Sequence, residues 1–162
     1  MKTKRNKNNK GFSLIELIIA VAILVVLSGL LAPQLIKYIE KSREAKDMQA
    51  IDSVYVAMNT ALADENAYDS FVKETATGGS LIKLTTDGML VKEITDTANA
   101  FSDEFEGILG EADITLKSKR GAGTAGGNGH SKVLVKVTDN NHVVVWAAGA
   151  SSDDKDDFTV GE

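Results

Sequence analysis

The chain has 162 residues, no cysteine, 18 basic and 23 acidic side chains, and a formal net charge of −5. The lack of cysteine excludes disulfides, thiolate metal sites and cysteine nucleophiles. Five of the 18 basic residues lie in the first ten positions, so residues 11–162 carry 13 basic against 23 acidic side chains, a net charge of −10. An acidic domain behind a basic tip argues against nucleic acid as a partner, because binding to phosphates needs basic patches.

The first ten residues form a basic leader without any acidic residue. An apolar run follows from Phe12 to Ala32, interrupted only by two serines, one glycine and Glu16. A helix of this length spans about 30 Å, the thickness of the hydrocarbon core of a bilayer. We therefore expect a membrane-spanning helix whose N-terminus is held on the cytoplasmic side by the basic flank.

A conventional secretory signal peptide is the main alternative for this segment. Its basic and apolar regions are present, but residues 30–34 lack a small-x-small cleavage site, and Pro33 follows the best position for a cut. The helical pattern also continues beyond Pro33 without a change of register. These features favour a helix that is retained.

A single helix is expected from Phe12 to Ala63, with a kink at Pro33. Its second half is amphipathic, which predicts that it packs on the rest of the chain. The expected apolar stripe comprises Leu35, Ile39, Ser42, Ala45, Met48, Ile51 or Asp52, Tyr55, Met58 and Leu62. The expected solvent face comprises Lys37, Glu40, Lys41, Arg43, Glu44, Lys46 and Asp47.

Residues 64–113 are predicted to connect this helix to a sheet through short helical pieces. Ser80 is expected to cap a short helix, and Asp87-Gly88 marks a turn before a short apolar segment at residues 89–91. Residues 96–109 show helical spacing, with Gly110 as the stop signal.

Strand character dominates from residue 114 onward. Strands are expected at residues 114–116, 132–138 and 142–147, with a hairpin turn at 139–141. Val133, Val135 and Val137 should share one face. Three or four antiparallel strands packed on the long helix make an α+β fold, and residues 151–162 are expected to be a mobile acidic tail.

No catalytic, cofactor or metal site is predicted. The glycines at 121, 123 and 126 match the dinucleotide fingerprint formally, but a strand follows them where the fingerprint needs a helix. His130 and His142 are expected to be solvated side chains, and the aspartates at 153–157 lack the glycine and spacing of a calcium loop. We expect a protein that is not an enzyme.

The segment Lys10-Gly11-Phe12-Ser13-Leu14-Ile15-Glu16-Leu17 resembles the prepilin peptidase site of type IV pilins and pseudopilins. Pro33, 21 residues after Phe12, stands where that family has its helix kink. The resemblance covers residues 1 to about 35, and the missing cysteine pair makes the chain similar to Gram-positive, clostridial-type major pilins. It implies cleavage between Gly11 and Phe12 at the cytoplasmic face, N-methylation of Phe12, and assembly into a helical fibre.

Physical arguments accompany these expectations. Glycine at the cut lets a protease approach the backbone, because it lacks a Cβ. Cleavage creates an α-amine at Phe12 with an ordinary pKa of about 8. In a dry bundle of apolar helices that cation needs an anion, so Glu16 is expected to pair with the Phe12 amine of a neighbouring subunit or of its own. The alternative for Glu16 is a carboxylate near the lipid headgroups.

The expected organisation is a cleaved leader (1–11), a transmembrane and assembly helix (12–33) and a pilin domain (34–162). The domain comprises the amphipathic half-helix (34–63), the connecting region (64–113), the sheet (114–150) and the acidic tail (151–162). The resemblance implies a major pilin for adhesion, motility or biofilm. Its partners would be further pilin subunits, prepilin peptidase, a membrane assembly platform and, before assembly, the cytoplasmic membrane; the final location is an extracellular filament.

Three alternatives remain. A pseudopilin of a type II secretion or competence system shares the same start. A membrane-anchored surface binding domain would keep its leader. A membrane-tethered enzyme would need a site that the sequence does not show.

Overall fold

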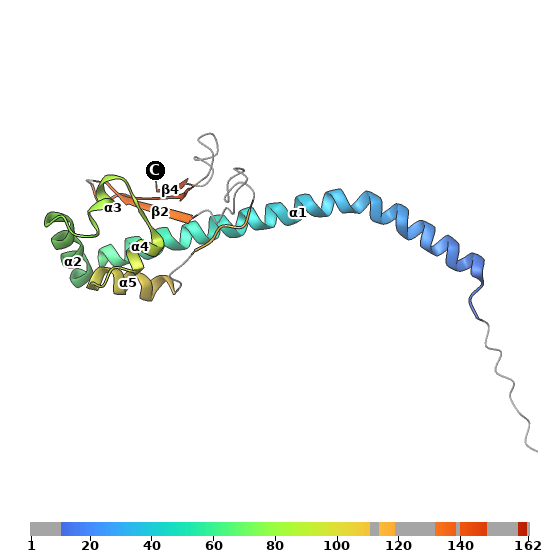
Figure 1. Cartoon of the computed structure of the whole chain (residues 1–162), viewed down its shortest axis with the longest axis horizontal. Coiled ribbons are helices and arrows are strands. Elements are labelled where there is room, and N and C mark those ends of the chain that lie inside the picture. Colours follow the sequence, from blue (N-terminus) through green and yellow to red (C-terminus); the bar gives the residue numbers. More distant parts are fainter. Residues whose placement is uncertain (1–10, 111–113, 119–131, 139, 149–158, 162) are drawn as a thin grey trace, which may run out of the picture. The chain divides into compact units, whose positions relative to one another are not determined.

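The computed structural model describes residues 11–110, 114–118, 132–138, 140–148 and 159–161 (Figure 1). The chain divides into two compact units, Met1–Ile39 and Glu40–Glu162, which are described separately below. The elements in chain order are α1 (Leu14–Ala63), α2 (Glu65–Ala76), α3 (Ile82–Thr86), β1 (Met89–Leu90), α4 (Val91–Thr95), α5 (Ala100–Leu109), β2 (Lys132–Val137), β3 (Val143–Ala148) and β4 (Thr159–Val160). The α+β fold with a long N-terminal helix is confirmed.

Helix α1 contains 50 residues and continues through Pro33, as expected. It begins at Leu14, two residues after the predicted start, because Ser13 forms its N-terminal boundary. In the first unit every side chain from Gly11 to Ile39 is exposed. The kink predicted at Pro33 stays a prediction.

The part of α1 in the second unit buries one stripe of side chains, at steps of three and four residues. The buried residues are Asp47, Ile51, Val54, Ala57, Met58 and Ala61. Ile51 and Met58 belong to the predicted stripe, but Leu35, Ile39, Ala45 and Asp52 are exposed. The prediction that Asp47 lies on the solvent face was wrong, since Asp47 is only 4% exposed. Backbone N–H groups from a distant segment satisfy its carboxylate and so allow its burial.

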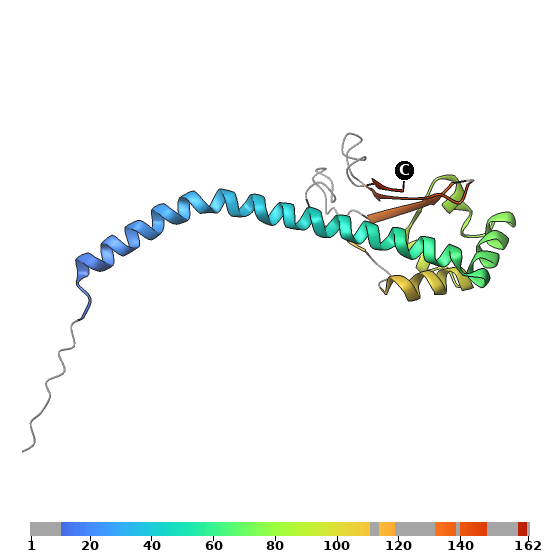
Figure 2. The same ribbon diagram turned by 180° about the vertical axis from the view of Figure 1, so that it is seen from behind.

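The four strands form one antiparallel sheet in the order β1-β2-β3-β4. The β2–β3 pairing runs from Lys132 opposite Ala148 to Val137 opposite Val143. Side chains alternate along both strands, and Val133, Val135 and Val137 are buried on one face, as predicted. In Figures 1 and 2 the sheet and α5 lie on opposite sides of the C-terminal part of α1.

The predicted hairpin between β2 and β3 is confirmed. Thr138 N–H donates to the His142 carbonyl at 2.8 Å, and Asn141 N–H donates to the Thr138 carbonyl at the same distance. Asn141 has a positive φ of 58°, a conformation that asparagine tolerates better than most residues. Its side-chain amide donates to the Tyr68 hydroxyl of α2 at 3.2 Å, so the turn is tied to a helix far away in sequence.

Helix α5 begins and ends as local chemistry dictates. The Asn99 side chain accepts a hydrogen bond from Ser102 N–H at 2.9 Å, which caps the N-terminus. Gly110 ends the helix in the left-handed conformation with φ 75°, and its N–H donates to the Glu106 carbonyl. The predicted stop at Gly110 is confirmed.

Several local predictions were wrong. Ser80 does not cap α3, whose N-terminal boundary residue is Leu81 without a side-chain hydrogen bond; Ser80 N–H donates instead to Glu74 Oε2. Helix α4 was not predicted, since its five residues are too short to show a period. Residues 114–116 contain an isolated bridge at Leu116 rather than a strand.

The predicted acidic tail contains β4, a two-residue strand that pairs with β3 through Val145–Val160 and Trp146–Thr159. His142 is exposed beside the hairpin turn. The basic leader, the glycine-rich stretch with His130, and the Asp153–Asp157 run lie outside the described residues.

Candidate processing and assembly site

The junction between Gly11 and Phe12 lies immediately before α1, in a segment with neither helical nor strand structure. The Phe12 residue is 93% exposed. A Cβ atom built on Gly11 would meet no heavy atom within 4 Å. The chain's own packing therefore does not require glycine here, which is consistent with a requirement imposed by a molecule that approaches this bond.

The first turn of α1 brings Ser13 and Glu16 together. Ser13 N–H donates to Glu16 Oε2 at 2.8 Å, and Leu17 N–H donates to the Ser13 carbonyl at 3.2 Å. This is the carboxylate half of a capping box, in which an acidic residue at the third helical position bonds the backbone N–H of the N-cap residue. The negative charge also lies where the helix dipole favours it.

This local role of Glu16 was missed by the sequence analysis, although the Ser-x-x-Glu pattern at 13–16 is a known signal for a helix start. The carboxylate reaches the backbone nitrogen next to Phe12. The predicted pair between Glu16 and a Phe12 amine needs a cleaved chain, so it stays a prediction.

Within the described residues of the first unit, nothing covers the apolar half of α1. Its large apolar side chains from Leu14 to Leu31 are 49–77% exposed. Ser28 Oγ donates to the Leu24 carbonyl at 2.7 Å, so this hydroxyl is satisfied within the helix and adds little cost in an apolar medium. A contiguous apolar surface of this kind normally marks contact with lipid or protein.

Among the described residues, α1 is the helix long and apolar enough to cross a membrane. A signal sequence near an N-terminus would satisfy the same criterion of length and composition. The same described part of the chain contains no group of three or more potential metal ligands. The features that remain to be explained are thus the Gly11–Phe12 junction, Glu16 and the exposed apolar helix.

Comparison with known proteins addresses these features directly. Residues 6–32 match the family described as the prokaryotic N-terminal methylation motif. Over 69 residues the chain is 32% identical to the type IV major pilin protein PilA of Myxococcus xanthus. The matched region covers 43% of this chain. The chain spans 31% of the length of that relative. No solved structure matches the chain significantly.

The family match includes the Gly11–Phe12 junction and the N-terminal part of α1. The relative is a major pilin protein, which is consistent with the expectation of a structural protein. A membrane-inserted state followed by incorporation into a pilus is consistent with the motif and the apolar helix. The chain therefore resembles type IV pilins and other prepilin-like proteins, and the resemblance is carried by its match to the N-terminal methylation motif.

Proposed function

We propose that this chain is the major subunit of a type IV pilus, polymerised through the apolar half of α1. The observation that carries the proposal is the contiguous exposed apolar surface directly behind the Gly11–Phe12 junction. Lipid covers this surface before assembly, and the corresponding helices of neighbouring subunits cover it in the fibre. The resemblance to a major pilin supports this role over that of a minor subunit.

Processing precedes assembly in this proposal. Prepilin peptidase cleaves between Gly11 and Phe12 on the cytoplasmic side of the membrane, and Phe12 becomes N-methylated. Removal of the leader takes away five positive charges that a dry fibre core does not tolerate. The exposed, non-helical junction and the open space around Gly11 support an accessible cleavage site.

Glu16 then neutralises the new Phe12 amine in the growing fibre. Burial of an unpaired ion costs several kcal/mol. An incoming subunit is therefore most stable in the fibre where its Phe12 amine lies beside a carboxylate. Before assembly Glu16 is engaged by its own Ser13 N–H, which keeps the carboxylate close to the helix start. The same residue thus caps the helix in the free subunit and pairs the cation in the fibre.

The finer assignment is a cysteine-free, Gram-positive, clostridial-type pilin that serves adhesion, motility or biofilm formation. It is held in the cytoplasmic membrane with its N-terminus inside, and the assembly platform then transfers it into an extracellular filament. The lack of cysteine and the acidic domain support this assignment and argue against nucleic acid as a partner. Pro33 would provide a kink that lets the helix adapt to its neighbours.

A pseudopilin of a secretion or competence system is the second candidate, because such proteins share the N-terminal features. It would remain mostly in the membrane fraction, and its loss would impair secretion or DNA uptake while long surface filaments persist. A membrane-anchored binding domain would instead keep residues 1–11.

Electron microscopy of a deletion strain and its complemented counterpart tests the proposal. We expect surface filaments to vanish in the deletion strain and to return on complementation, with this chain as the main component of sheared material. Undiminished filaments in the deletion strain would overturn the assignment as a major pilin.

A further inference from the structure

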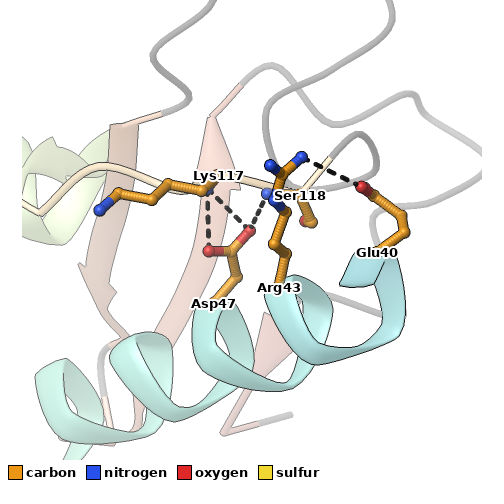
Figure 3. A network of polar contacts seen from close by, with 5 residues as sticks. All are labelled: Glu40, Arg43, Asp47, Lys117 and Ser118. Atoms are coloured by element: carbon orange, nitrogen blue, oxygen red, sulfur yellow. Dashed lines mark hydrogen bonds and ion pairs between the residues drawn. The ribbon is translucent and has the colours of Figure 1, made fainter. Parts of the chain in front are cut away.

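Asp47 of α1 holds a segment that is about seventy positions away in sequence. Its Oδ1 accepts a hydrogen bond from Lys117 N–H at 2.9 Å. Its Oδ2 accepts from the same N–H at 3.0 Å and from Ser118 N–H at 2.7 Å (Figure 3). Both carboxylate oxygens are therefore used by the backbone of one short segment, Ile114–Ser118, which we call the strap.

The strap is buried at alternate residues and lies outside the four-stranded sheet. Leu116 is 2% exposed and Ser118 is fully buried. The strap is nevertheless not part of the four-stranded sheet, and its only regular backbone feature among the described residues is the isolated bridge at Leu116. Among the described contacts, the Asp47 carboxylate is a direct polar attachment of the strap to α1, and the strap side chains of Ile114 and Leu116 are buried as well.

The arginine one turn before Asp47 is paired with another carboxylate. Arg43 lies one turn before Asp47, and its guanidinium contacts Glu40 at 3.6 Å (Figure 3). Hydrogen bonds from backbone amides, rather than this ion pair, satisfy the buried Asp47 carboxylate. Hydrogen bonds to a charged acceptor are about twice as strong as neutral ones, which makes Asp47 the main attachment point.

The strap also forms one wall of a groove of about 470 Å³. The α1 side of the groove comprises Lys46, Gln49, Ala50 and Ser53. The opposite side comprises Leu109, Gly110, Ile114, Thr115 and Lys117. Displacement of the strap would therefore remove this wall of the groove and release the Asp47 carboxylate, whereas Lys46, Gln49 and Ser53 are exposed already.

We propose that Asp47 is a latch and that the strap opens as a local unit while the sheet stays folded. Proteins open in units whose free energy depends on how much backbone pairing and apolar burial each contributes. Strands β2 and β3 have a six-residue ladder and an array of buried valines, whereas the strap shows, among the described residues, one isolated bridge at Leu116. Opening of the strap alone therefore breaks fewer of the described backbone pairings than opening of the sheet.

The latch has a consequence that rests on the proposed role as a filament subunit. Asp47 is the first buried residue of α1. The state of the latch therefore sets whether the Asp47 carboxylate is held by its own domain or is available to a neighbouring subunit. The latch itself is a property of the single chain and can be tested without filaments.

Native-state hydrogen exchange of the full chain in detergent micelles, at several low urea concentrations, tests the wild-type protein. We expect the amides of Lys117 and Ser118 to exchange faster than those of Val135 and Val145, with a smaller dependence on urea, because local opening exposes little surface. Equal rates and equal urea dependence for strap and sheet would overturn the proposal, since the strap would then open only with the whole domain.

The variant Asp47→Ala tests the latch. We expect the strap amides to exchange within about threefold of the unfolded chain, while β2 and β3 amides remain at least about 100-fold slower than that reference. Asp52→Ala, an exposed position on the same helix, is the matched control and should behave like the wild type. Retained strap protection in Asp47→Ala would overturn the proposal, and so would loss of sheet protection or failure of this variant to fold.

Discussion

Ser13 N–H donates a 2.8 Å hydrogen bond to the carboxylate of Glu16, three residues further along the first turn of α1. This bond gives Glu16 a role in the isolated chain that is independent of any second subunit. It also separates two functions of the residue experimentally, because a glutamine can accept the same hydrogen bond without carrying a charge.

Substitution of Glu16 should therefore distinguish helix capping from charge pairing. Glu16→Gln keeps the acceptor for Ser13 N–H but should fail to form filaments nearly as severely as Glu16→Ala, because each Phe12 amine would enter the core unpaired at a cost of about 3–5 kcal/mol. Glu16→Asp should be intermediate. The measurement is sheared filament normalised to processed subunit in the membrane.

Membrane insertion and processing serve as controls for these variants, and both should continue, since the cleavage site is untouched and Glu16→Ala makes the helix more apolar. Normal filament yield from both Glu16→Ala and Glu16→Gln would refute the charge pair. Normal yield from Glu16→Gln alone would indicate that capping is the function that matters.

Gly11→Val should block cleavage and leave the intact chain in the membrane. No heavy atom lies within 4 Å of a Cβ built on Gly11, so the substitution should not disturb the fold, and its effect should arise at the peptidase. Mass spectrometry of surface material should find a wild-type chain that starts at Phe12 with a methylated amine. Gly29→Ala, at another glycine with open space around it, should be processed normally.

An intact N-terminus in wild-type surface material, or a start near Gln34, would contradict the predicted processing. Normal cleavage of the Gly11→Val chain would show that the peptidase recognises residues other than Gly11.

A truncated chain that begins at Gln34 should be soluble and monomeric. The apolar surface proposed to drive assembly lies almost entirely before this residue, whereas the second unit has a buried core of its own. Sedimentation of this fragment gives the test, with a fragment that begins at Glu40 as the comparison. A stable polymer formed by both fragments would place the assembly interface in the second unit.

Two neighbouring polar side chains at the start of α5 should differ in their contribution to stability. Asn99→Ala removes the cap on Ser102 N–H and should lower the free energy of unfolding by about 1 kcal/mol. Ser102 is 1% exposed and its Oγ has no hydrogen-bond partner among the described residues, so Ser102→Ala should be neutral or stabilising. Urea denaturation of both variants is the measurement, and a larger loss for Ser102→Ala would show that its hydroxyl is bonded.

Gly161 tests whether β4 contributes to the fold. Its φ is 95°, and an added Cβ would collide with the Val143 carbonyl oxygen and come within 2.7 Å of Tyr55 Cε2. Gly161→Ala should therefore destabilise the second unit by about 1–3 kcal/mol. Gly107→Ala, within α5 and with open space around it, should instead stabilise by about 0.5–1 kcal/mol. An unchanged unfolding midpoint for Gly161→Ala would mean that β4 adds nothing.

Elements with strong local signals were predictable. The stop at Gly110 follows from glycine's access to positive φ, and the hairpin at Asn141 follows from turn chemistry combined with alternating valines. Elements without such signals were missed. Helix α4 has five residues, and β4 has two at the end of an acidic stretch, so neither shows a usable period.

The sequence by itself determined the membrane-length helix, and it also carries the predicted processing site. The Gly11–Phe12 junction, Glu16 and the apolar run are contiguous, and their properties depend on composition and helical rise rather than on distant contacts. Only the tertiary structure decided which side of α1 the domain covers. Asp47 lies four residues before Ile51 on the buried stripe, but its charge placed it on the predicted solvent face. It is buried because Lys117 and Ser118 bring their N–H groups to its carboxylate, and these partners about seventy residues away cannot be read from the local sequence.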